Sequence, residues 1–220
     1  MIEEILPGCV AVAESRGDVL DATLFPEEEA TVGRAVEKRR REFATGRACA
    51  RAALTRLGVP AQPIPGGDHG APRWPAGIVG SITHCEGYRA CAVARSNELS
   101  SVGIDAEPNE PLPEGVLGDI ALPQERESLL GLQRDSPEVH CDRLLFSMKE
   151  AVYKAWFPLA RRWLGFEDAV IAIDPGDGSF SARLLVPGPS MGGAGLRGFR
   201  GRWLVRDGLV LTAIAHPLSA

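Results

Sequence analysis

The sequence predicts an α+β protein built from two similar halves, with the active site in the crevice between them. Three observations support this fold. Each half holds one long helix, each helix is followed by a strand hairpin, and a shift of 103 residues brings the two helices into partial register. The shift places Arg40, Phe43, Ala48, Arg51 and Ala52 on Arg143, Phe146, Ala151, Lys154 and Ala155. We therefore expect a pseudo-dimer divided into residues 1–101 and 102–220.

Composition limits the classes of partner. A chain of 220 residues with 45% apolar residues can form one large domain or two small ones. The net charge of −5 gives no overall attraction for nucleic acid. Five cysteines without Cys-x-x-Cys spacing indicate reduced thiols and a cytoplasmic protein. No signal peptide and no apolar run of ~20 residues is evident, so we expect no membrane partner.

The first half should begin with a strand near residues 9–13 and a helix at Pro26, because proline and the acids after it suit the first turn of a helix. A longer helix is expected over residues 36–57, ended by Gly58. This helix is rich in arginine, and surface ion pairs and phosphate binding are equally good readings of that cluster. Its arginines are Arg39, Arg40, Arg41, Arg47 and Arg51.

A glycine-rich loop over residues 60–75 precedes two expected strands, 77–84 and 88–94. The first strand ends in Thr83 and His84. A histidine there can contact a substrate, although a lone histidine is more often structural. Residues 95–101 are polar and short, and we take them as the connection between the halves.

The second half is expected to begin with a strand over residues 102–108 that carries Asp105 and Glu107. Residues two apart on a strand point to the same face, so the two carboxylates should project together. Two close negative charges need a cation, and Mg²⁺ prefers carboxylate oxygens completed by substrate phosphates. A solvated strand edge is the alternative reading.

A helix is expected within residues 112–132, a loop over 134–140, and a second long helix from Cys141 to Trp156. Further strands should follow at 169–173, 179–186, 201–205 and 209–215. The run from Asp174 to Gly178 predicts a turn, and residues 187–198 a long loop.

The second long helix places Ser147, Glu150 and Lys154 on one stripe and its apolar residues on a separate arc. Lys149 lies beside neither. Taken alone, Glu150 and Lys154 favour an ordinary i,i+4 surface ion pair. Together with Asp105, Glu107, His84 and the arginine cluster, they predict magnesium-dependent transfer from a donor that carries a diphosphate.

Two runs of residues carry a family resemblance. The segment VGIDAE at 102–107, followed some forty residues later by FSMKEAVYKA at 146–155, resembles the two signature motifs of the 4′-phosphopantetheinyl transferase superfamily. The upstream segment GSITHC at 80–85 is similar to the Sfp/EntD-type branch, built as a monomeric pseudo-dimer. The chain looks most like the actinobacterial members that serve polyketide, nonribosomal-peptide and fatty-acid carrier proteins.

The resemblance implies transfer of the 4′-phosphopantetheine group from coenzyme A to a serine of an apo carrier protein, giving adenosine 3′,5′-bisphosphate. It implies that Asp105, Glu107 and Glu150 hold Mg²⁺, with Mn²⁺ as the alternative. Glu150 would be the base and Lys154 would stabilise the transferring charge. Coenzyme A would also be bound by phosphate contacts, which are expected from Lys149, Lys154, Arg39, Arg47, His69, Thr83 and His84.

The loop around His69 departs from the family pattern. Related chains carry basic residues there, whereas this one reads Gly66-Gly67-Asp68-His69, so only His69 can supply the contact. Two alternatives remain from the sequence. One is a magnesium-dependent phosphotransferase acting on a small nucleotide, and the other is an inactive coenzyme A-binding or carrier-docking module.

Overall fold

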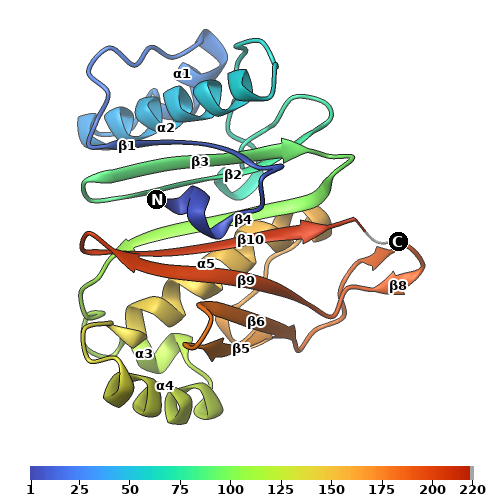
Figure 1. The fold of residues 1–220 in the computed structure, drawn as a ribbon. Coiled ribbons are helices and arrows are strands. Elements are labelled where there is room, and N and C mark those ends of the chain that lie inside the picture. Colours follow the sequence, from blue (N-terminus) through green and yellow to red (C-terminus); the bar gives the residue numbers. More distant parts are fainter. Residues whose placement is uncertain (219–220) are drawn as a thin grey trace.

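A computed structural model of the chain describes residues 1–218. It contains two main sheets, each covered by one long helix (Figure 1). Within residues 1–218, no helix is both long enough and apolar enough to cross a membrane.

The first half contains a three-stranded antiparallel sheet in the order β1-β3-β2. Its strands are β1 (Ala11–Arg16), β2 (Ile78–Cys85) and β3 (Tyr88–Arg95). A 3-10 turn (η1, Ile2–Ile5) precedes β1, and the helices α1 (Pro26–Val32) and α2 (Glu37–Arg56) lie between β1 and β2 in sequence. A second 3-10 turn (η2, Asp68–Gly70) lies in the glycine-rich loop. The strand expected at 9–13 is displaced toward residue 16, so only part of that prediction is correct.

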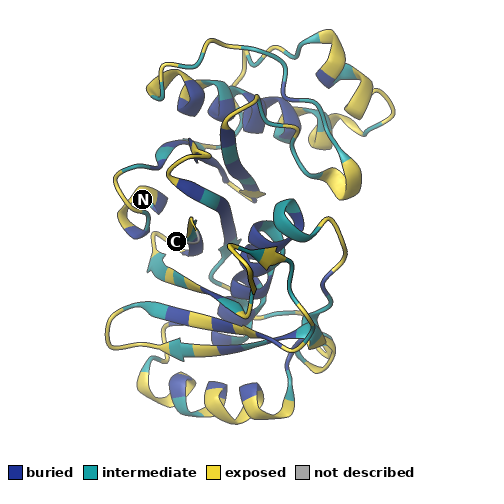
Figure 2. Ribbon diagram, turned by 90° about the vertical axis from the view of Figure 1, so that its right-hand side faces the viewer, coloured by how far each residue is buried: buried dark blue, intermediate teal, exposed yellow. Residues whose placement is uncertain are grey.

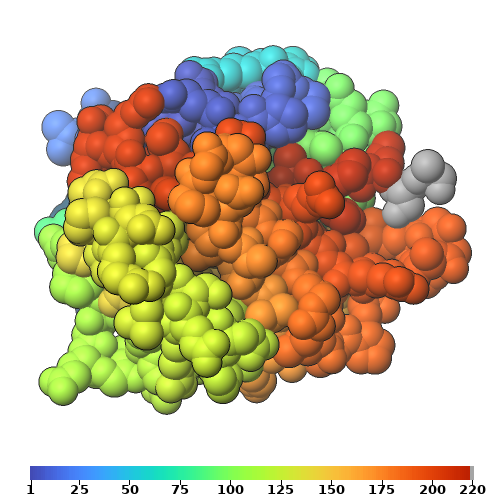
Figure 3. Space-filling model, turned by 60° about the horizontal axis from the view of Figure 1, so that its bottom comes forward, coloured from blue at the N-terminus to red at the C-terminus, as the bar shows by residue number. Residues whose placement is uncertain are grey.

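The second half contains a five-stranded sheet in the order β4-β10-β9-β6-β5. Its strands are β4 (Leu99–Pro108), β5 (Ala169–Asp174), β6 (Ser179–Leu184), β9 (Gly198–Arg206) and β10 (Leu209–Pro217). Its helices are α3 (Val116–Ile120), α4 (Pro123–Asp135), α5 (Cys141–Ala160) and the short η3 (Phe166–Asp168). Seen from below, α3 and α4 lie beside the β5–β6 hairpin (Figure 3).

Three expected boundaries are wrong. The connection between halves is shorter than residues 95–101, because β4 already begins at Leu99. Helix α5 continues past Trp156 to Ala160 with Pro158 inside it, since a proline in the last turn removes a single helical N–H bond. The long loop after residue 187 contains a small hairpin of β7 (Ser190–Met191) and β8 (Ala194–Gly195).

The two halves repeat one topology, which confirms the α+β pseudo-dimer. In each half a strand precedes the long helix and a hairpin follows it. The first strand then pairs with the last strand of that hairpin, in the order β1-β3-β2 in one half and β4-β10-β9 in the other. Helices α2 and α5 are each 20 residues long and occupy equivalent places.

Apolar packing explains why the elements take these places. Helix α2 packs on one face of the first sheet through Ala50 and Leu54, and α5 packs on the second sheet through Met148 and Trp156. A third cluster, which includes Ile2 and Ile104, joins η1 to both sheets. Figure 2 shows this burial along the strands and the inner sides of the helices, with the outer side of α4 exposed.

Strands β2 and β4 join the two sheets. The hydrogen bonds between them run from backbone N–H groups of β4 to side-chain hydroxyls of β2. The backbone N–H of Ile104 donates to Ser81 Oγ at 3.1 Å, and that of Ala106 donates to Thr83 Oγ1 at 3.0 Å. Both contacts advance two residues along β2 and β4, so these strands run parallel. The join therefore ends next to Asp105, at the crevice between the halves.

Candidate active site

The two predicted motifs meet across β4 and α5. Lys154 Nζ lies 2.6 Å from Asp105 Oδ1, so Lys154 pairs with Asp105 and not with its helical neighbour Glu150. The surface-pair reading of the α5 stripe is therefore wrong. Helix α5 reaches β4 closely because residue 103 is glycine: a Cβ there would lie 2.2 Å from the carbonyl oxygen of Ala151.

Asp105 is buried, with 3% of its surface exposed. The Thr83 hydroxyl donates to Asp105 Oδ1 at 3.3 Å while it accepts the N–H of Ala106. Among the residues that the structure describes, Asp105 Oδ2 has no hydrogen-bond partner. A buried carboxylate oxygen without a partner is costly, so it is a candidate ligand for a cation.

Glu107 is held by Arg143, from the first turns of α5. Arg143 Nη1 lies 3.0 Å from Glu107 Oε2, and the same guanidinium donates to the carbonyls of Glu110 and Pro111. Burial raises the pKa of Glu107 to about 7, with Asp105 adding to the shift and Arg143 opposing it. Arg143 was not among the site residues expected from the sequence, although residues 143, 147, 150 and 154 share one helical face.

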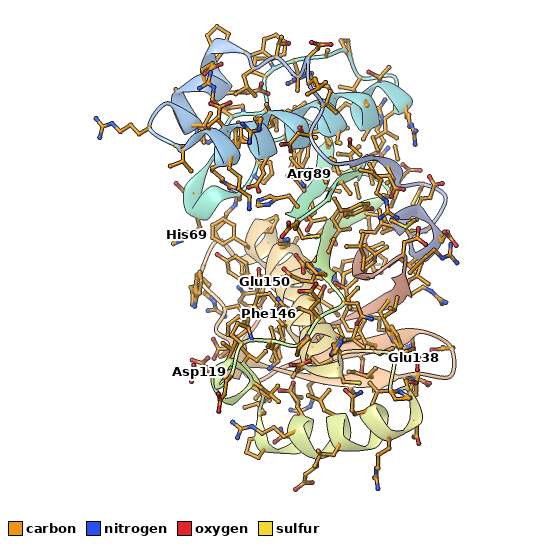
Figure 4. The ribbon with its side chains drawn as sticks, turned by 90° about the vertical axis from the view of Figure 1, so that its left-hand side faces the viewer. His69, Arg89, Asp119, Glu138, Phe146 and Glu150 are labelled. Carbon is orange, nitrogen blue, oxygen red and sulfur yellow. The ribbon has the colours of Figure 1, made fainter. Side chains whose placement is uncertain are left out.

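Glu150 lies on α5, where the charges of Lys154 and Asp105 act on it. In Figure 4 it stands at mid-height, between the His69 loop above it and Phe146 further along α5. Burial raises the pKa of Glu150, Lys154 opposes the shift, and Asp105 adds to it. A carboxylate whose pKa is raised toward neutrality is a more effective proton acceptor at pH 7.

A pocket of about 250 Å³ lies next to Lys154. It is bounded by α2 and β2 of the first half and by α5 of the second. Its lining includes the expected coenzyme A contacts Arg39, Arg47, His69, Thr83, His84 and Lys154. A second pocket of about 210 Å³ shares His69 and Lys154 with the first and extends to Glu150 and Tyr153. The crevice thus gathers cationic side chains from both halves.

The α2 arginines divide into two groups. Arg40, Arg41 and Arg51 form ion pairs with Glu29, Asp18 and Glu28, so the structural reading holds for these three. Arg39 and Arg47 line the pocket, and Arg39 Nη1 also lies 3.8 Å from Glu42 Oε2. The Arg47 guanidinium stacks 3.9 Å from the centre of the Phe43 ring and donates Nε–H to the carbonyl of Ile64 at 2.7 Å. Burial lowers the pKa of Arg47 to about 10, which leaves it charged at pH 7.

His84 contacts Arg39 Nη1 and lies 3.8 Å from Glu42. Burial, and then the charge of Arg39, lower the pKa of His84 to about 4, so the imidazole is neutral at pH 7. His69 has a left-handed backbone (φ 53°), and its ring packs edge-on to Phe157 with centroids 5.4 Å apart. Since a guanidinium only donates, neutral His84 accepts from Arg39 at Nε2 and carries its N–H on Nδ1, on the side of Glu42.

The contacts of Lys149 contradict its expected role as a phosphate contact for coenzyme A. It is 4% exposed, and its Nζ lies 2.9 Å from Glu125 Oε2, 2.7 Å from the carbonyl of Phe166 and 3.1 Å from that of Ala169. All three ammonium protons therefore have partners inside the protein, and none is free for a coenzyme A phosphate. Glu125 was not identified from the sequence, because nothing in its spacing links α4 to Lys149.

Within residues 1–218, no three or more His, Cys, Asp or Glu side chains already form a metal-binding group, the expected carboxylates included. The donor set nevertheless fits a hard divalent cation. Asp105, Glu107 and Glu150 offer only oxygen ligands, and no group within residues 1–218 forms a hydrogen bond with Asp105 Oδ2. A cation completed by water and substrate phosphates needs few protein ligands.

The chain is similar to known proteins over nearly its whole length. Residues 27–94 match the family model of the 4′-phosphopantetheinyl transferase N-terminal domain, and residues 101–190 that of the 4′-phosphopantetheinyl transferase superfamily. The chain is 56% identical to the 4′-phosphopantetheinyl transferase Svp of Streptomyces mobaraensis, over 100% of this chain and 91% of that protein. It is 52% identical to Npt of Nocardia iowensis, over 98% and 100%, and 50% identical to PptT of Mycobacterium tuberculosis, over 97% and 97%.

Proposed function

The chain belongs to the 4′-phosphopantetheinyl transferase superfamily, and we propose that transfer takes place in the crevice between its two halves. The enzyme moves the 4′-phosphopantetheine group of coenzyme A to a serine of an apo carrier protein and releases adenosine 3′,5′-bisphosphate. The contact of Lys154 with Asp105 carries the proposal, because it joins both motifs beside the Arg39–His84 pocket.

In this proposal, residues 1–101 supply the 3′-phosphate side of the site and residues 102–220 the metal and catalytic motifs. Arg39, Arg47 and His84 surround the 3′-phosphate, with Thr83 and His69 at the pocket wall. Lys154 reaches the diphosphate. The charged guanidinium groups suit phosphate oxygens, to which they donate paired hydrogen bonds.

A separate, mainly apolar cavity lies beside the two pockets of the crevice. This cavity, of about 140 Å³, adjoins Lys149, Glu150 and Tyr153. The rest of its lining is mainly apolar: Val152, Trp163, Leu164, Phe166 and Ala169. Because Glu150 and Tyr153 also line the pocket that adjoins Lys154, the two spaces meet at the reacting end of the diphosphate. We assign the arm to this cavity.

Asp105, Glu107 and Glu150 would hold Mg²⁺, with Mn²⁺ as the alternative. The cation, when bound, neutralises negative charge on the diphosphate. Asp105 Oδ2 is the ligand best prepared for it, since it is buried and lacks another partner among the described residues. Arg143 binds Glu107 Oε2.

The transfer follows from these positions. The serine oxygen of the carrier forms a bond to the β-phosphorus while the bond from that phosphorus to the bridging oxygen breaks. Glu150 accepts the serine proton, and the raised pKa of Glu150 favours this step. Lys154 donates hydrogen bonds to the oxygens that gain charge as adenosine 3′,5′-bisphosphate leaves.

The remaining assignments are also proposals. We propose that the chain acts as a cytoplasmic monomer on carrier proteins or domains of polyketide, nonribosomal-peptide and fatty-acid synthases. Its cysteines are free, which suits a reducing compartment. Its net charge of −5 argues against nucleic acid as a partner.

Mass spectrometry tests the proposal. An apo carrier protein incubated with the enzyme, coenzyme A and Mg²⁺ should gain the mass of one phosphopantetheine group on serine. Glu150→Gln should slow this gain strongly, whereas Glu127→Gln, on the exposed side of α4, should not. No gain on several carriers would favour an inactive module, and turnover without a carrier would favour a small-molecule phosphotransferase.

A further inference from the structure

A buried ion pair lies directly behind the active-site stripe of α5. The side chains of Lys149 and Glu125 are 2% and 1% exposed, and their charged atoms lie 2.9 Å apart. Glu125 Oε1 also accepts the N–H of Ile171, and Oε2 accepts that of Leu122, both at 2.7 Å. Lys149 and Glu125 therefore connect α5 to α4 and to the segment that runs into β5.

This pair is better suited to fixing positions than to adding stability. Replacing a buried ion pair by apolar residues of similar volume is often neutral or stabilising, because desolvation offsets the attraction. In this pair, however, all three ammonium protons of Lys149 and both carboxylate oxygens of Glu125 are engaged. The partners of the two side chains are therefore held in a single arrangement. Here the partners are backbone groups from three separate elements.

The positions held in this way belong to the cavity assigned to the pantetheine arm. Lys149 donates to the carbonyls of Phe166 and Ala169, and both residues line that cavity. The facing wall is α5 itself, with Glu150, Val152 and Tyr153. The ammonium group thus sets the separation of the two walls, and the neighbouring residue on the chain is the proposed base.

We infer that Lys149 and Glu125 are positioning residues that hold the pantetheine cavity open beside Glu150. The inference rests on the proposed function of that cavity. Lys149 contributes to the lining of the cavity, but its ammonium group is engaged by Glu125 and the two carbonyls, and Glu125 is not among the lining residues. The ion pair fixes the rotation of α5, so that Glu150 faces the crevice while the 163–169 segment stays at the right distance to receive the arm.

Two ligands separate this role from a general structural one. Coenzyme A fills both the phosphate pocket and the arm cavity, whereas adenosine 3′,5′-bisphosphate lacks the arm. Loosening the pair should weaken binding of the first ligand and leave the second unaffected. A variant that merely disturbs the fold would weaken both.

The test uses the full-length double variant Glu125→Met/Lys149→Met, which avoids an unpaired buried charge. Folding is checked by thermal unfolding. We expect the KM for coenzyme A to rise at least tenfold, while the inhibition constant of adenosine 3′,5′-bisphosphate changes less than twofold. Glu125→Gln, which keeps one acceptor oxygen, should fall between wild type and the double variant.

A matched control breaks another buried ion pair. Arg51→Met removes the partner of Glu28, which is fully buried in the first half. This variant should not change the ratio of the two constants. If it changes the ratio as much as the double variant does, the inference is overturned, because any loss of a buried pair would then suffice.

Two further outcomes would overturn the inference. Parallel weakening of both ligands in the double variant, or weakening of neither, would exclude a role at the arm cavity. Equal affinity of the wild-type enzyme for coenzyme A and adenosine 3′,5′-bisphosphate would remove the arm from the cavity and the positioning role with it. That last result would leave phosphopantetheinyl transfer itself intact, so the two failures are distinguishable.

Discussion

Gly103→Ala should damage both stability and catalysis through one contact. The missing side chain of Gly103 allows α5 to lie directly on β4. A Cβ there would stand 2.2 Å from the Ala151 carbonyl oxygen, 2.7 Å from the Ala155 nitrogen and 2.9 Å from the Ala155 Cβ. The first two atoms are backbone, so no side chain can rotate to relieve the clash.

The size of the effect follows from these distances. Ordinary contacts begin near 3.4 Å, so α5 must retreat by about 1 Å from β4. Overpacking of this kind costs about 1–3 kcal/mol of unfolding free energy. The retreat also stretches the 2.6 Å contact of Lys154 with Asp105 beyond hydrogen-bond reach. A displacement of about 1 Å can reduce the rate on the order of 10²-fold.

Urea unfolding and initial rates of holo carrier formation measure the two effects. Gly131→Ala is the matched control, because a Cβ added to this helical glycine of α4 would meet nothing within 4 Å. Alanine at position 131 should stabilise the protein by about 0.5–1 kcal/mol, since it has the higher helix propensity. Wild-type stability and rate in Gly103→Ala would refute the close approach of α5 to β4.

Three further predictions concern charge in the crevice. The pKa of Glu107 is about 7 in the folded protein against an ordinary 4.5, so the folded state binds this proton more tightly. Protonation of Glu107 therefore stabilises the folded state fully below pH 4.5, and this stabilisation is lost as the pH rises through 7. Metal-free urea unfolding at pH 5 and 8 should show a decrease of up to about 3 kcal/mol that Glu107→Gln removes; an unchanged decrease in the variant would contradict the assignment. Arg47→Met should raise the KM for coenzyme A about tenfold or more by losing a charged phosphate contact, and equal effects on dephospho-coenzyme A would remove Arg47 from the 3′-phosphate site. Asp105→Asn should lower the transfer rate on the order of 10²-fold or more, since Lys154 loses its ionic partner and the cation a ligand, and near wild-type rates at saturating Mg²⁺ would argue against both roles.

Local patterns predicted the architecture well because they reflect forces within single elements. The helical period placed α2 and α5, and the matching order of strand, helix and hairpin revealed the repeat. The predicted boundaries were wrong where pairing with a distant segment determines whether a residue belongs to a strand. Leu99 joins β4 because β10 pairs with it there, and the sequence around residue 99 carries no sign of that partner.

The site shows the same limit. Spacing alone could pair Asp105 with Glu107 on one strand and Glu150 with Lys154 on one helical stripe. Lys149 could not be placed correctly, since its partner Glu125 lies on another helix and the receiving carbonyls belong to backbone. Arg143 could have been found from the sequence, because it continues the stripe by one further turn.

The hydroxyl join between β2 and β4 has a consequence for how the protein can change over time. Bonds of a backbone ladder survive almost any substitution, because every residue except proline carries the same N–H and C=O groups. Here Ser81 and Thr83 replace the ladder, so the contact between the halves is open to point mutation. Thr83→Val would delete a hydrogen bond between the halves and a hydrogen bond to Asp105 in one step. A substitution at Thr83 would therefore affect both the contact between the halves and the hydrogen bonding of Asp105.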